Sequence, residues 1–161
     1  MIVVDAKGNE LLDIINVEEE NADKQYEPIK HCLAVVKIED DYLMGWNKWR
    51  QDWEIFGGCR EDRESIRDCV IRECKEELGL TNVDFKYLGL IYYKMAPGYF
   101  NPKWHYEYGG LYGVTLSKKY LEIIEKYRTD KEEVEKLAFY SAIKGKEPIA
   151  MIDEKLLEYW K

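Results

Sequence analysis

One segment of this sequence is marked as a helix more clearly than any other part of the chain. Its apolar and small residues recur at helical spacing, at Ile66, Cys69, Val70, Cys74 and Leu78. Gly79 follows at the position where a residue of left-handed conformation commonly ends a helix. The segment therefore predicts an amphipathic helix that ends at Gly79 and packs its apolar stripe against the rest of the fold.

The remaining periodicities predict strands and helices without a regular βαβ alternation. Strands are expected over 2–5, 11–17, 29–38, 42–44, 53–56, 85–95 and 104–116, of which the first two form a hairpin and the fifth stops at Gly57-Gly58. A charged helix is expected over 118–127, and Asp153 is expected to be the N-cap of a last short helix. The stretch 134–141 fits helix or strand, with strand favoured, and the acidic stretch 18–23 is expected to be a solvated loop. This mixture favours an α+β layer architecture.

Length, charge and cysteine usage limit the classes of function. The 161 residues are expected to form one domain, 1–161, and the apolar runs are far too short to cross a membrane. A formal net charge of −8 argues against a surface for duplex nucleic acid, because phosphate contacts need clustered Lys and Arg. The N-terminus lacks the basic segment of a signal peptide, and the four cysteines form no CxxC pair. We therefore expect a cytoplasmic protein with reduced thiols.

Three glutamates share one face of the predicted helix. At about 100° per residue, Glu73, Glu76 and Glu77 fall within an arc of about 100°. Neighbouring like charges destabilise a helix unless solvent or a counter-ion compensates them. A hard divalent cation such as Mg²⁺, which prefers oxygen ligands, would provide the counter-charge. A solvated acidic face is the alternative interpretation.

The spacing of residues around these glutamates resembles the Nudix box. All seven fixed positions of that family's motif are present, as Gly58, Glu64, Arg72, Glu73, Glu76, Glu77 and Gly79. Cys74 and Leu80 hold the two aliphatic positions. Phe56 replaces the proline that usually precedes the Gly-Gly pair, and Arg63 stands where a glycine is common, so the loop that enters the box is expected to differ in shape.

Similarity to Nudix hydrolases implies an α/β/α sandwich with a central mixed β-sheet and a Mg²⁺- or Mn²⁺-dependent attack of water on a nucleoside diphosphate derivative. The resemblance makes Glu73, Glu76 and Glu77 metal ligands, with the Gly57 carbonyl as an addition, and Glu73 also the general base. It makes Arg72 a partner of Glu64 or Glu73 that holds the catalytic carboxylates in place, a task that suits its charged fork.

In relatives the base or a further ligand sometimes comes from outside the box. The candidates here are Glu107 and the run 130–135, in which Glu133 is the first choice because it precedes the predicted late strand. A solvated charge run is the alternative for this segment.

Aromatic and basic residues are candidate substrate contacts. Trp104, Tyr106, Tyr108 and Tyr112 share one face of a predicted strand, which favours core packing over base stacking. Tyr99 and Phe100 fall in a loop with Pro and Gly and are expected to contact a base or sugar. Arg50 and Arg60, together with Lys48 and Lys103, are candidates for phosphate contacts, with solvated surface as the alternative.

Two substrate classes and one class of non-enzyme compete. The segment 107–112 resembles a strand of MutT-like triphosphate hydrolases, including those that act on oxidised guanine nucleotides, whereas Pro97 lies close to a position typical of ADP-ribose hydrolases. The triphosphate interpretation ranks first. A non-catalytic module that binds nucleotides or RNA ends is the alternative, although the three retained glutamates argue against it. A small nucleotide is the expected partner, and the aromatic strands also allow a homodimer.

Overall fold

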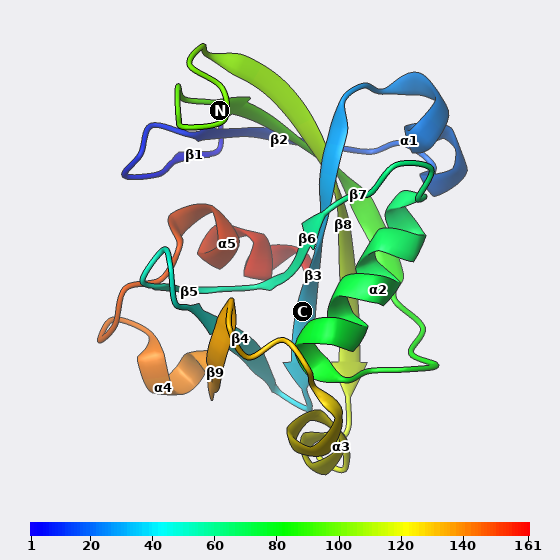
Figure 1. The fold of residues 1–161 in the computed structure, drawn as a ribbon, viewed down its shortest axis with the longest axis vertical. Coiled ribbons are helices and arrows are strands. Elements are labelled where there is room, and N and C mark those ends of the chain that lie inside the picture. The colour runs from blue at the N-terminus through cyan, green and yellow to red at the C-terminus, as the bar shows by residue number, and fades with distance from the viewer.

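The computed structural model describes residues 1–161, and its strands form one mixed sheet (Figure 1). The main path of the sheet runs β1-β2-β7-β8-β3-β4-β5, while β6 pairs with β3 and β9 pairs with β4. All these pairs are antiparallel except β3 with β8. The strands are β1 (Val3–Val4), β2 (Glu10–Ile15), β3 (Ile29–Ile38), β4 (Asp41–Asn47), β5 (Asp52–Glu54), β6 (Phe56–Cys59), β7 (Lys86–Met95), β8 (His105–Leu116) and β9 (Val134–Phe139).

Helices cover both faces of this sheet. One face packs against α1 (Glu19–Gln25), α2 (Ile66–Leu78) and α3 (Tyr120–Tyr127) around 21 buried residues, and the other against α4 (Tyr140–Ile143), α5 (Met151–Leu156) and a 3-10 turn (Leu157–Tyr159) around 12. Figure 1 shows α2 and α5 on opposite sides of the central strands. The expected α/β/α layering with a mixed sheet is confirmed, and the α2 face carries the larger core. None of the helices has the length and apolarity needed to span a lipid bilayer.

The prediction of α2 is confirmed at both ends. Ser65 caps the first turn, with its hydroxyl oxygen accepting the Asp68 N–H at 3.0 Å. Gly79 ends the helix in the left-handed region, at a φ of 66°. The apolar stripe between these caps is fully buried, at Ile66, Cys69, Val70, Cys74 and Leu78.

The acidic segment expected to be a loop is a helix. Residues 18–23 mostly belong to α1, whose Ala22 is completely buried. Glu19 accepts two hydrogen bonds from the Arg67 guanidinium, at 2.7 and 2.9 Å, and one from the Tyr112 hydroxyl at 2.8 Å. The prediction was wrong because these partners lie far away in the sequence and a charge run alone favours solvation.

The strand expected over 53–56 is divided in two, and the glycines do not stop it. Gly57 and Gly58 lie inside β6, where they pair with Leu33 and Cys32 of β3. A Cβ on Gly57 would lie 2.0 Å from the Cys32 carbonyl oxygen, so this close approach of two backbones requires glycine.

Asp153 is not the N-cap of the last helix. Ala150 occupies that position in α5, and the Asp153 carboxylate instead accepts the Ile55 N–H at 3.0 Å. This contact bridges α5 to the residue between β5 and β6. The helix is therefore tied to the strands that lead into the box.

Four aromatic residues in β8 and directly before it were expected to pack in the core. The structure confirms this for two of the four. Tyr112 is fully buried and Tyr108 packs against the core, whereas Trp104 and Tyr106 are half-exposed. Tyr92 of β7 stacks on Tyr106 and Tyr108, with ring centroids 5.7 and 4.9 Å apart. Common strand parity places the rings on one face, but helix cover extends over only part of that face.

Candidate active site

Arg72 lies between two carboxylates of the predicted site. Its Nε and Nη2 donate to the Glu64 carboxylate at 2.7 and 3.0 Å, and its Nη1 donates to Glu73 at 3.0 Å. Nη2 also reaches the Cys59 carbonyl oxygen at 3.0 Å. The hydrogen bond from Arg72 lowers the pKa of Glu64 to about 2. Arg72 thus contacts both Glu64 and Glu73, which were expected as alternative partners, and it joins α2 to the loop before the helix.

Glu73 is held against the strand that enters the helix. A Cβ on Gly58 would lie 2.5 Å from the Glu73 carboxylate, so glycine leaves the space that this side chain fills. Burial raises the pKa of Glu73, while the neighbouring Arg72 acts in the opposite direction. The result is a fixed carboxylate with increased affinity for a proton.

Glu77 is the most buried acidic side chain of the site, with 3% of its surface exposed. It accepts the Gly57 N–H at 2.8 Å and has no cationic side chain within 4 Å. Burial raises its pKa well above the usual range. Ligand atoms of Glu77, Asp130 and Glu133 all lie within 4.8 Å of one another.

Asp130 and Glu133 come from the segment between α3 and β9, more than fifty residues after Glu77. The Asp130 N–H donates to the Glu76 carbonyl oxygen at 2.8 Å, which fixes the segment to the C-terminal end of α2. The Asp130 carboxylate accepts the Glu133 N–H at 3.1 Å, so a local turn brings the two carboxylates to the same side. Burial raises the pKa of Glu133 as well.

A model of the NUDIX domain matches residues 30–159 of this chain. The chain belongs to the Nudix family. No curated protein sequence matches it.

Solved structures share the Nudix fold at low sequence identity. A MutT NUDIX hydrolase from Burkholderia pseudomallei has a TM-score of 0.62 and 16% identity, over 83% of this chain and 98% of that one. The Bacillus subtilis pyrophosphohydrolase BsRppH has a TM-score of 0.62 and 17% identity, over 97% and 94%. The E. coli dihydroneopterin triphosphate pyrophosphohydrolase has a TM-score of 0.58 and 14% identity, over 82% and 96%. Family and fold together support the expected enzyme class, a hydrolase of pyrophosphate bonds.

The donor set of this Nudix chain fits a hard divalent cation. Glu77, Asp130 and Glu133 offer carboxylate oxygens only, the ligand type that Mg²⁺ and Mn²⁺ prefer. A buried carboxylate without a cationic partner is costly, and two more carboxylates nearby add to the repulsion. Bound positive charge would remove both costs.

The grouping differs from the four ligands expected from the box. Only Glu77 belongs to the close group, whereas Glu73 and the half-exposed Glu76 lie against Arg72, at 3.0 and 3.6 Å. The Gly57 N–H points to Glu77. The sequence placed both acids in the candidate run 130–135 and favoured Glu133, and the structure brings Asp130 to Glu77 together with it.

The other candidate residues differ in how close they come to this group. Arg50 binds Glu54 at 2.6 and 2.8 Å and reaches Glu133 at 3.4 Å, so it borders the acidic group. Arg60 is tied to Asp23 of the α1 helix at 3.0 Å. Glu107 accepts from His105 at 3.1 Å and is not part of the group, so the structure brings Glu133 rather than Glu107 to the box helix.

Tyr99 and Phe100 lie apart from the Nudix carboxylates. Both side chains are 96% exposed, and they contact each other edge to face with centroids 5.1 Å apart. Figure 1 shows the β7–β8 loop at the opposite end of the molecule from the C-terminal end of α2. Contact of these residues with the substrate stays a prediction.

Proposed function

We propose that this Nudix chain is a divalent-cation-dependent hydrolase that cleaves the diphosphate linkage of a nucleoside diphosphate derivative, with a nucleoside triphosphate as the first candidate. The group formed by Glu77, Asp130 and Glu133 carries this proposal. These three side chains would hold Mg²⁺ or Mn²⁺, with Glu73 and Glu76 as further ligands. A cation bound there supplies charge that neutralises phosphate oxygens and lowers the pKa of a water molecule.

Glu73 is the proposed general base. Its pKa is raised by burial, which strengthens its affinity for the proton of an attacking water, and the hydrogen bond from Arg72 fixes its orientation. Glu64 holds the other side of the Arg72 fork and keeps that hydrogen bond in place. Glu133, whose pKa is also raised, is the second candidate for the base.

Two observations support a triphosphate substrate. The segment 107–112 resembles a strand of MutT-like triphosphate hydrolases, and the E. coli structure of similar fold is named as a triphosphate pyrophosphohydrolase. Arg50 borders the acidic group and is the proposed contact for phosphate oxygens that extend beyond it. Oxidised guanine nucleotides are the finer candidates within this class.

The test is hydrolysis of a substrate panel in Mg²⁺ or Mn²⁺, covering nucleoside triphosphates, oxidised guanine nucleotides, ADP-ribose and dinucleoside polyphosphates. We expect cation-dependent turnover of a triphosphate, reduced at least about a hundredfold by Glu77→Gln. Glu122→Gln, an exposed change on α3, is the matched control and should leave turnover unchanged. Preference for ADP-ribose would replace the triphosphate, and nucleotide binding without hydrolysis of any substrate would favour the binding module.

A further inference from the structure

The segment between α3 and β9 must be held in place against the repulsion between carboxylates. It brings the carboxylates of Asp130 and Glu133 within 4.8 Å of the Glu77 carboxylate. Charges of the same sign at this distance repel each other strongly in a partly buried site. Until a cation compensates them, contacts elsewhere must keep this segment in place.

The Arg128 guanidinium makes such contacts at both ends of the segment. Its Nη1 donates to the carbonyl oxygens of Asp130 and Val134 at 3.1 and 2.9 Å, and its Nη2 donates to the Glu135 carbonyl oxygen at 3.1 Å. No carboxylate lies within 4 Å of Arg128. Its charge is therefore directed to the backbone around Asp130 and Glu133, not to an ion pair.

The backbone of Arg128 is itself fixed by two helices. Its N–H donates to the Ile124 carbonyl oxygen at 3.1 Å, at the end of α3. On the other side it abuts the end of α2, since a Cβ on Gly79 would lie 2.7 Å from the Arg128 nitrogen. The backbone that carries the Arg128 guanidinium is thus held against the ends of both α2 and α3.

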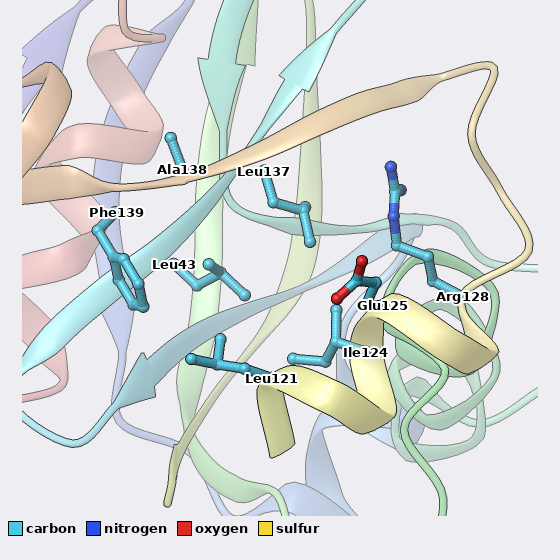
Figure 2. Close-up of a pocket in the computed structure, with 8 residues that line it drawn as sticks. All are labelled: Leu43, Leu121, Ile124, Glu125, Arg128, Leu137, Ala138 and Phe139. Carbon is cyan, nitrogen blue, oxygen red and sulfur yellow. The ribbon is translucent and has the colours of Figure 1, made fainter. Parts of the chain in front are cut away.

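The side chain of Arg128 borders a cavity with a mostly apolar lining. It lines this cavity together with Leu121, Ile124, Glu125 and Leu137, as Figure 2 shows. In that view the guanidinium points toward β9 and away from the side chains of Leu121 and Ile124.

We propose that Arg128 is a positioning residue for the cation site, clamping the backbone of residues 130–135 so that Asp130 and Glu133 meet Glu77. This inference rests on the proposed function of those carboxylates. Two nitrogens of a planar fork are needed to reach three carbonyl oxygens, and a lysine offers only one nitrogen. Arg128→Lys therefore keeps the charge and loses most of the clamp.

Three measurements on Arg128→Met and Arg128→Lys test the clamp. The first is the Kd for Mn²⁺, measured by electron paramagnetic resonance, and we expect it to rise about tenfold or more in both variants. The second is amide hydrogen exchange without metal, which should become faster in residues 129–135. The third is kcat at saturating Mn²⁺. We expect it to return close to the wild-type value, because Arg128 positions ligands and does not contact the reacting atoms.

Arg67→Met and Arg67→Lys are the matched controls. Arg67, near the start of α2, also donates two hydrogen bonds through its guanidinium, but to the Glu19 carboxylate of α1. Its replacement should leave the Mn²⁺ affinity and the amide exchange of residues 129–135 unchanged. Unchanged affinity and exchange in folded Arg128 variants would overturn the proposal. Should Arg128→Met fail to fold, Arg128→Lys decides alone. A wild-type chain that binds no Mn²⁺ would defeat the proposed function, while the exchange comparison would still decide whether Arg128 holds the segment.

Discussion

At the scale of single residues, the carboxylates of this chain differ in their surroundings and therefore in their proton affinity. Glu64 faces the Arg72 fork, which lowers its pKa to about 2. Asp153 is partly buried beside the Ile55 backbone, where burial and the charge of Glu54 raise its pKa to about 8. The same functional group is thus kept ionised where a guanidinium binds it directly and neutral where burial and neighbouring acids outweigh the charge of Arg50.

Asp153 predicts how stability depends on pH. Because its pKa is higher in the folded chain than in the unfolded one, its favourable contribution is complete below about pH 4 and is lost as the pH rises toward 8. Asp153→Asn keeps an acceptor for the Ile55 N–H but cannot ionise beside Asp52, Glu54 and Arg50. We expect the variant to exceed wild type at pH 8 by on the order of 2 kcal/mol, since solvent reaches part of this side chain, and to match it near pH 4. Urea unfolding across this range measures both, and parallel pH curves would contradict the assignment.

At the scale of elements, the secondary structure of a segment could be predicted from the sequence where local residues alone determine it. Five apolar positions and Gly79 predict α2, and both its stripe and its left-handed end are found. The α1 helix was missed because its stability depends on Arg67 and Tyr112, which no local pattern connects to Glu19. Gly57-Gly58 continues a strand because β3 pairs with it, and this partner is likewise remote in sequence.

Gly79 and Gly145 allow backbone strain and steric clash, two effects of a side chain added at a helix end, to be measured separately. Both have positive φ, 66° and 71°, but a Cβ on Gly79 would lie 2.5 Å from the Tyr127 carbonyl carbon, whereas Gly145 has nothing within 4 Å. Gly145→Ala should cost about 1 kcal/mol of unfolding free energy, from backbone strain alone. Gly79→Ala adds a clash with the backbone of α3 and should cost roughly 2–4 kcal/mol. Urea denaturation of the two variants checks the difference, and equal losses would show that the contact with α3 adjusts freely.

At the scale of the whole molecule, the site depends on a contact that the fold creates. The box supplies Arg72, Glu73 and Glu77, and their spacing within one helix made them recognisable in the sequence. Asp130 reaches Glu77 only because the chain, after β7, β8 and α3, returns to the end of α2, where the Glu76 carbonyl oxygen accepts the Asp130 N–H. Position along one helix follows from periodicity, whereas the meeting of two distant segments depends on packing.

A cation bound between α2 and the segment that carries Asp130 and Glu133 should therefore stabilise the entire fold. A ligand that binds only the folded chain adds about 2.7 kcal/mol at a concentration one hundred times its Kd, which corresponds to a Tm increase of roughly 5–10 °C for a chain of this size. Glu77→Gln keeps an acceptor for the Gly57 N–H and removes a buried charge that has no cationic partner. Without metal at pH 8 the variant should melt above wild type, and with Mn²⁺ it should gain little.

The order of the two melting temperatures thus reverses on adding Mn²⁺, because the carboxylate that destabilises the metal-free fold is the one that holds the cation. Thermal unfolding with EDTA and with Mn²⁺ measures this reversal, with Glu122→Gln as the control that follows wild type in both conditions. A Glu77→Gln variant that responds to Mn²⁺ as strongly as wild type would place the cation elsewhere in the molecule.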